Sequence, residues 1–405
     1  MKLRLRCTAL LLILFLLSGC STPAVKATAP ASSGSEVAAP TPPPPPAEHA
    51  RILATGDFLM HLPLVYSSAR GKEQWDFTPL FEPIRPWIEG ADLAIGELET
   101  TLTGTDYPWS GYPSFNTPPE FARDIKLLGY DAVTNANNHA LDYSEYGLKQ
   151  TADALDRFGV PHVGTNRTPE EQNQILVLNV TKNIKMALLA YTYGTNGIPL
   201  PNPWCVNMLD PQRIQADIRR ARQMEGVDLV AVALHMGDEY AREPNEQQQE
   251  LVKLSLEAGA DIIFGDHPHV VQRAELQRVT DQFGRDLPRA VVYSFGNLIS
   301  NQEGMERLEG IMLVVDVVKE QGVTWIEKLS YIPVYTHTYQ QGADKHYRTV
   351  PIEQALRDYE QGKDPLITAA DYAQLKAAWA DTTARTEGNQ YVTLMHVDQP
   401  KAVQR

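Results

Sequence analysis

Carboxylate, imidazole and amide side chains recur at one kind of place in this sequence, directly after short apolar runs. If these runs are strands of an open α/β sheet, their carboxyl ends meet at the edge where such sheets bind ligands. Mixed oxygen and nitrogen donors suit Mn²⁺, Fe²⁺ or Zn²⁺ better than Ca²⁺. The pattern therefore predicts a site for one or two divalent metal ions. The residues are Asp57 after 51–56, Glu97 and Glu99 after 92–96, Asn137, Asn138 and His139 after 131–134, His235 and Glu239 after 229–234, Asp266, His267 and His269 after 262–265, and Asn297 after 290–296.

The segment His267-Pro268-His269 is the most specific piece of this pattern. Because the φ angle of Pro268 is fixed, the link between the two imidazoles is stiff and both can face one site. Each piece of the pattern also has a structural interpretation, as a turn, a hydrogen-bonded loop histidine or a helix start. The recurrence of such residues after nearly every apolar run favours the metal site.

The elements that would position these residues alternate between strand-like and helix-like patterns, which indicates an α/β fold. Strand pairs without a helix between them, such as the runs on either side of Gly322, indicate an added antiparallel part. A two-sheet sandwich with helices outside fits this mixture. Helices are expected at 80–88, 118–128, 148–158, 211–224 and 246–258. The tail from residue 349 is expected to contain two more, 352–361 and 369–381, and either to pack on the surface or to be partly mobile.

Composition excludes several classes of protein. The chain has 405 residues, of which 43% are hydrophobic, so it can bury a core and is not a disordered chain. It carries 36 Lys and Arg against 50 Asp and Glu, a net charge of −14 without a long basic run, which argues against a nucleic-acid partner. Three cysteines exclude a disulfide-stapled scaffold and a four-thiolate zinc site. Cys205 has no neighbouring base and is predicted to be buried or incidental rather than a nucleophile.

The first twenty residues are typical of an export signal, with a basic start and a short apolar run. Their ending, Leu17-Ser18-Gly19-Cys20, resembles the bacterial lipobox, which implies that Cys20 is lipidated and anchors the chain on the outer face of a bacterial membrane. The alternative is an ordinary signal peptide with a chance cysteine. Residues 21–50 contain eight prolines and are expected to form an extended tether. At ~3.1 Å per residue, the tether could reach roughly 90 Å from the membrane.

Six segments together resemble the successive signatures of the CapA family of poly-γ-glutamate capsule-biosynthesis proteins. The resemblance extends from Ile52 to Tyr335 and implies a four-layer α/β/β/α sandwich of the calcineurin-like phosphoesterase (metallophosphatase) type. It also implies a role in making, exporting or attaching an anionic γ-linked polyglutamate. The segments are Gly56-Asp57-Phe58-Leu59-Met60, Glu97-Leu98-Glu99-Thr100, Asn137-Asn138-His139-Ala140-Leu141-Asp142, His235-Met236-Gly237-Asp238-Glu239, Gly265-Asp266-His267-Pro268-His269 and Ser294-Phe295-Gly296-Asn297.

The resemblance also implies roles for single residues. His139 matches a general acid, or a group that stabilises the transition state, whereas a loop-shaping histidine bonded to Asp142 is the structural alternative. The usual Asp-x-His of the pattern is Asp57-Phe58-Leu59 here, with His61 off the spacing, which leaves open whether one or two ions bind. Predicted metal ligands are Asp57, Glu99, Asn138, His235, His267 and His269, and predicted substrate-binding residues are Glu97, where family members often have Asn, Glu239 and Asn297.

The expected organisation is a signal peptide at 1–19, a lipidated Cys20 with its tether at 20–50, a metallophosphatase-like domain at 51–336 and a mainly helical extension at 337–405. One predicted function is metal-dependent hydrolysis of a phosphoester or of an amide or ester bond of the polymer. The other is a non-catalytic, polymer-binding subunit of a membrane synthase or export complex. Removal of Lys2, Arg4 and Arg6 with the signal leaves 33 basic against 50 acidic residues, a charge of −17 that would repel polyglutamate.

Overall fold

The computed structural model describes residues 46–386 and 391–397. The signal peptide, Cys20 and all but the end of the tether therefore lie outside the described residues. Within the described ranges, no helix combines the length and the apolar character needed to cross a bilayer.

The first sheet is mixed, with its strands in the order β14-β13-β12-β1-β2-β3-β4. The strands from β1 to β4 run parallel, and β12, β13 and β14 are antiparallel neighbours. Short β11 pairs with β1, and β15 pairs with β13. The strands are β1 (Glu48–Phe58), β2 (Leu93–Glu97), β3 (Ala132–Thr134), β4 (His162–Val163), β11 (Asn297–Ile299), β12 (Glu309–Glu320), β13 (Val323–Gln341), β14 (Asp344–Pro351) and β15 (Val392–Leu394).

The second sheet has the order β5-β6-β7-β8-β10-β9. Its four central strands are parallel, and the edge strands β5 and β9 are antiparallel to their neighbours. The strands are β5 (Leu176–Asn179), β6 (Lys185–Thr192), β7 (Leu229–His235), β8 (Ile262–Asp266), β9 (Ala274–Thr280) and β10 (Asp286–Val292).

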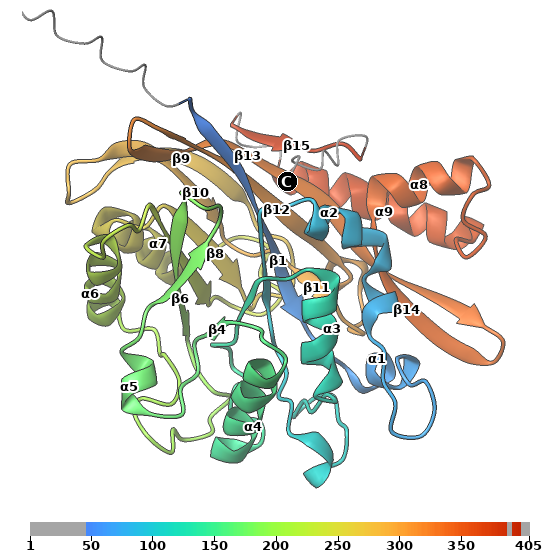
Figure 1. The fold of residues 1–405 in the computed structure, drawn as a ribbon. Coiled ribbons are helices and arrows are strands. Elements are labelled where there is room, and N and C mark those ends of the chain that lie inside the picture. Colours follow the sequence, from blue (N-terminus) through green and yellow to red (C-terminus); the bar gives the residue numbers. More distant parts are fainter. Residues whose placement is uncertain (1–45, 387–390, 398–405) are drawn as a thin grey trace, which may run out of the picture. The chain divides into compact units, whose positions relative to one another are not determined.

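The two sheets pack face to face. Alternate residues of each strand face opposite sides, so one strand contributes to the core between the sheets and to the core under the helices. On β1, Ile52 and Ala54 join the core between the sheets, together with Leu188 of β6, whereas Leu53 faces the helices on the other side. Helices α2 (Arg85–Glu89), α3 (Glu120–Leu128) and α4 (Ser144–Arg157) cover the outer face of the first sheet (Figure 1). Helices α6 (Pro211–Arg222) and α7 (Glu246–Ala258) cover the outer face of the second sheet (Figure 1). The predicted α/β class and its four-layer α/β/β/α arrangement are therefore confirmed.

Helix ends follow local sequence signals. Asn245 and Gln248 form a capping box at the start of α7, and the helix ends at Gly259, whose φ of 115° is accessible mainly to glycine. Asp210 caps α6 by accepting hydrogen bonds from two backbone N–H groups. The helices are α1 (Leu62–Ser67), α2 (Arg85–Glu89), α3 (Glu120–Leu128), α4 (Ser144–Arg157), α5 (Pro169–Gln172), α6 (Pro211–Arg222), α7 (Glu246–Ala258), α8 (Ile352–Glu360) and α9 (Ala369–Thr386).

Three expectations about the elements require correction. The expected helix at 80–88 is broken into 3₁₀ turns and the short α2, because prolines recur through this region. The boundary predicted between 336 and 337 falls inside β13, and the boundary predicted at 50/51 falls inside β1. The described part of the extension contains the end of β13 together with β14 and β15, in addition to two helices. Helices α8 and α9 do form, and they bury Ile352, Leu375 and Ala378 against the end of the first sheet.

Candidate metal centre

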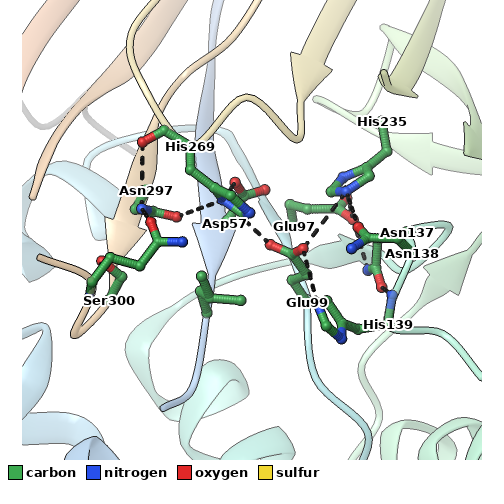
Figure 2. Close-up of polar contacts among 12 residues, drawn as sticks. Asp57, Glu97, Glu99, Asn137, Asn138, His139, His235, His269, Asn297 and Ser300 are labelled. Atoms are coloured by element: carbon green, nitrogen blue, oxygen red, sulfur yellow. Dashed lines mark hydrogen bonds and ion pairs between the residues drawn. The ribbon is translucent and has the colours of Figure 1, made fainter. Parts of the chain in front are cut away.

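The polar residues at the strand ends converge on one place (Figure 2). Asp57 lies near the end of β1, Glu97 ends β2, and Glu99 follows two residues later. His235 and Asp266 end the neighbouring strands β7 and β8 of the other sheet. The predicted ligands Asp57, Glu99, Asn138, His235, His267 and His269 are all buried, with 3% or less of their surface exposed. Their clustering in the interior is what a shared site requires.

One group of donors surrounds the Nδ1 atom of His269. This atom lies 3.1 Å from Oδ2 of Asp57, 3.0 Å from Oδ1 of Asn297 and 3.9 Å from Oε2 of Glu99. Ligand atoms of Asp57, Glu99 and His269 all fall within 4.8 Å of one another, a spacing that one metal ion can bridge.

A second group lies on the other side of Glu99. Nε2 of His235 lies 2.7 Å from Oδ1 of Asn138 and 3.7 Å from Oε1 of Glu99. The imidazole of His267 packs beside that of His235, with ring centroids 5.0 Å apart. Glu99 therefore presents one carboxylate oxygen to each group, which is the arrangement of a bridging ligand.

Several buried atoms of this centre that could bind a metal have no hydrogen-bond partner among the described residues. They are Oδ1 of Asp57, both carboxylate oxygens of Glu99, Nδ1 of His235, Oδ1 of Asp266 and Nδ1 of His267. A buried charge without a partner is expensive, so such atoms fit a cation site better than a finished hydrogen-bond network.

The pKa shifts of these groups also favour a cation site. Burial, followed by repulsion from Asp57, raises the pKa values of Glu99 and Asp266 well above the usual range. Burial lowers the pKa of His267 to about 3 and that of His235 well below its usual value, so both imidazoles are neutral near pH 7. A neutral imidazole has a free lone pair for a metal, and a buried carboxylate ionises more readily when a cation is close. This set of imidazoles and carboxylates therefore suits a divalent metal ion.

His139 borders the second group without joining it. Its Nδ1 atom lies 2.8 Å from Oδ2 of Asp142, and its Nε2 atom lies 4.0 Å from Oε1 of Glu99. The backbone N–H of Phe115 donates to the same Asp142 oxygen at 2.6 Å, and the Phe115 ring meets the imidazole edge to face. Asp142 thus fixes the ring so that Nε2 faces the centre. The bond to Asp142 that defined the structural alternative is present, and it also orients a group that could exchange a proton.

The structure separates the three predicted substrate-binding residues. Glu239 is exposed and lies near His267 and His269, at the opening of the centre. Asn297 is fully buried beside His269. Glu97 is also buried, with 2% of its surface exposed.

Glu97 lies beneath His235. Its carboxyl group accepts hydrogen bonds from Thr134 and from Asn137, and one oxygen lies 3.8 Å from Nδ1 of His235. Burial raises the pKa of Glu97 to about 8. Its position behind the imidazole of a predicted metal ligand is typical of a carboxylate that orients such a ligand.

Two neighbours of the centre, Asp266 and Tyr193, have no role predicted from the sequence. Asp266 was part of the strand-end pattern but was not predicted as a ligand, although it is buried against Asp57. The ring of Tyr193 packs on His267, with centroids 4.3 Å apart, and is 41% exposed at the opening. A lone tyrosine after β6 carries no sequence signal. Cys205 is buried against Ala140 and Leu141, as predicted, and burial raises its pKa.

The four-layer sandwich with carboxylates, histidines and an asparagine gathered at its strand ends defines an α/β protein with a candidate metal centre. A family model described as bacterial capsule synthesis protein PGA_cap matches residues 51–302, and the chain belongs to this family. The predicted membership is therefore confirmed.

Two relatives give the degree of similarity. The PGA biosynthesis protein CapA of Bacillus subtilis is 27% identical over 254 residues, which cover 62% of this chain and 64% of that protein. The capsule biosynthesis protein CapA of Bacillus anthracis is 26% identical over 258 residues, which cover 61% of this chain and 60% of that protein. The chain thus matches less than two thirds of the length of each relative.

Solved structures with partial similarity include a calcineurin-like phosphoesterase, YfkN, from Bacillus subtilis. It is 15% identical, with a TM-score of 0.42, and the match covers 84% of this chain and 99% of that chain. A phosphatase from Mycoplasma pneumoniae is 13% identical, with a TM-score of 0.41, over 71% of this chain and 94% of that chain.

Proposed function

We propose that this chain is a lipid-anchored, extracytoplasmic protein of capsule biosynthesis whose metal centre hydrolyses a bond of poly-γ-glutamate or a phosphoester. The observation that supports it most is the carboxylate of Glu99. It is fully buried, both of its oxygens lack a hydrogen-bond partner, and each oxygen faces a different group of donors. A divalent cation gives this carboxylate a partner that the described residues do not.

The chain's own residues divide into holding and reacting groups. Asp57, Glu99 and His269 would hold one ion, and Glu99 with Asn138, His235 and His267 would hold a second. A bound divalent ion supplies Lewis acidity toward a phosphoryl or acyl oxygen and activation of water. The buried setting strengthens these electrostatic effects, because few water dipoles compete with them.

His139 would act as the proton donor. With Nδ1–H bonded to the Asp142 carboxylate, the opposite nitrogen, Nε2, carries the exchangeable proton toward the centre. A leaving group placed between Nε2 and the Glu99 side of the centre could accept that proton as its bond breaks. Asp142 would then stabilise the charge of the imidazolium that precedes transfer.

The proposal also places the protein at the cell surface, where the polymer would be its substrate. Lipidation of Cys20 would hold the domain at the outer face of the membrane, where a capsule polymer emerges. The mature charge of −17 opposes the approach of polyglutamate, so cations in the centre would have to offset this repulsion locally.

The experiment is metal analysis combined with turnover on the purified full chain. We expect tightly bound divalent metal, together with hydrolysis of a generic phosphodiester or of a γ-glutamyl amide oligomer. Glu99→Gln should remove metal and turnover together, whereas Glu320→Gln, an exposed residue at the far end of β12, should change neither. A wild-type chain free of metal after exposure to Mn²⁺ and Zn²⁺ would contradict the proposal.

A second candidate is a non-catalytic subunit of a membrane synthase or export complex. The observation in its favour is Leu59, a buried apolar residue that occupies a position where the resembled pattern has a metal ligand. The Nδ1 atom of His61 lies 3.2 Å from the backbone nitrogen of Asn301 and 3.1 Å from the backbone oxygen of Leu59, so this nitrogen already has backbone partners. Metal binding without turnover, together with co-purification of membrane synthase components, would favour this candidate.

A further inference from the structure

Asn297 is placed beside Asp57 by the pairing of two strands. β1 and β11 run parallel, and Asp57 is the residue directly opposite Asn297 in their register. Side chains of directly paired residues lie on the same face of a sheet. Asn297 therefore faces the first donor group, and its side chain is fully buried there.

The amide of Asn297 has a fixed orientation. Its Nδ2 atom donates to Oε1 of Gln302 at 2.9 Å and to the backbone oxygen of Arg307 at 2.8 Å. The backbone oxygen of Arg307 can only accept, so the amide nitrogen must face it, and a flipped amide would set its oxygen against that oxygen. The Oδ1 atom is thereby directed toward Nδ1 of His269, 3.0 Å away (Figure 2).

What Oδ1 of Asn297 contacts depends on whether Nδ1 of His269 carries a proton or binds a metal. A neutral imidazole nitrogen either carries a proton and donates, or has a free lone pair and binds a metal. Nδ1 of His269 also faces Asp57 and Glu99, the other members of the same donor group. When this nitrogen binds an ion it cannot donate to Asn297. The buried Oδ1 atom would then lose its hydrogen-bond donor when an ion binds to the nitrogen that lies 3.0 Å from it.

We propose that Oδ1 of Asn297 is a further ligand of the ion held by Asp57, Glu99 and His269, and that Gln302 and Arg307 position it. This inference rests on the metal centre of the proposed function. It changes the role of Asn297 from contact with substrate to coordination of metal. An amide oxygen is a suitable ligand for a hard or borderline ion such as Mn²⁺, and three protein donors leave coordination positions for it.

The test is Mn²⁺ binding to the full-length chain, measured by calorimetry and by the electron paramagnetic resonance spectrum of bound Mn²⁺. Asn297→Ala should weaken one class of Mn²⁺ site by at least ~100-fold, since loss of even an outer-shell partner typically costs about 10–100-fold in affinity. The spectrum of the remaining ion should also change if two ions were coupled through Glu99. Asn301→Ala is the matched control, because the Asn301 amide accepts from Tyr347 on β14 instead.

Gln302→Ala provides a second variant that leaves the Asn297 side chain intact. Freeing the amide should weaken the same class of site by about 10-fold, as expected for an outer-shell residue. Wild-type affinity and stoichiometry in both folded variants, with metal present in the wild type, would overturn the role of Asn297 and leave the proposed function standing. Absence of Mn²⁺ and Zn²⁺ binding in the wild-type chain would overturn both. If Asn297→Ala does not fold, an unchanged site in Gln302→Ala alone would overturn the inference.

Discussion

Glu309 predicts an unusual dependence of stability on pH. It starts β12, is 1% exposed, and packs against the end of α9. Thr382 donates to one carboxyl oxygen at 3.2 Å, and the carboxyl group of Asp381 lies beside this side chain. Burial, followed by repulsion from the Asp381 carboxylate, raises the pKa of Glu309 from its ordinary value of 4.5 to about 8. The folded protein therefore favours the neutral form of this side chain.

The sign and size of the effect follow from linkage. A carboxyl group whose pKa is raised by folding contributes most to stability below pH 4.5, and this contribution is lost as the pH rises toward 8. One pKa unit corresponds to ~1.4 kcal/mol, so ionisation of Glu309 should cost up to about 5 kcal/mol of unfolding free energy. Glu309→Gln keeps the shape of the neutral acid and cannot ionise. The variant should match the wild type near pH 4.5 and exceed it increasingly up to pH 8.

Urea unfolding at a series of pH values measures this difference directly. Glu320→Gln, at the exposed end of the same strand, is the control and should follow the wild type at every pH. A constant difference between Glu309→Gln and the wild type from pH 5 to 8 would refute the reasoning, since it would mean that Glu309 ionises equally in both states.

Three further predictions concern the centre, the strands and the anchor. His139→Gln should keep its metal but lower turnover by ~10²–10⁴-fold; loss of both would make His139 a ligand or a structural residue, and measurement of metal and turnover in one preparation decides. Gly56→Ala should abolish folding or lower the melting temperature sharply, because its Cβ would lie 2.1 Å from the backbone oxygen of Gly296; an unchanged melting curve would contradict this. Cys20→Ala should release the chain from the membrane fraction, and unchanged fractionation and lipid labelling would exclude the anchor.

Much of the fold could be predicted because its signals are local. Apolar runs that end in a polar residue mark β1, β7 and β8, and the glycine turn between β12 and β13 marks a hairpin. Strands β9 and β14 were missed because their residues are partly exposed and lack a continuous apolar run. The C-terminal end of β13 was also missed: the strand continues to Gln341, and no sequence signal marks an end or a continuation at residue 336.

The candidate site was harder to predict at the level of individual roles. Sequence spacing brought Glu97 and Glu99 to the same strand end, but it could not show that one lies beneath His235 and the other between the two donor groups. That difference depends on how the chain turns after β2. The orientation of the Asn297 amide depends on Gln302 and Arg307, which carry no motif of their own.

The segment that the family shares is shorter than the segment that must fold together, because β12 lies beyond the family match and pairs with β1 inside it. The family match ends at residue 302, but β12 begins at Glu309 and pairs with eight residues of β1, from Glu48 to Thr55. A fragment cut at the end of the match would expose this side of β1 as an open edge and remove Leu313 and Val315 from the core. Open edges recruit other chains, so such a fragment should aggregate. Residues beyond the shared segment are therefore part of what makes that segment soluble.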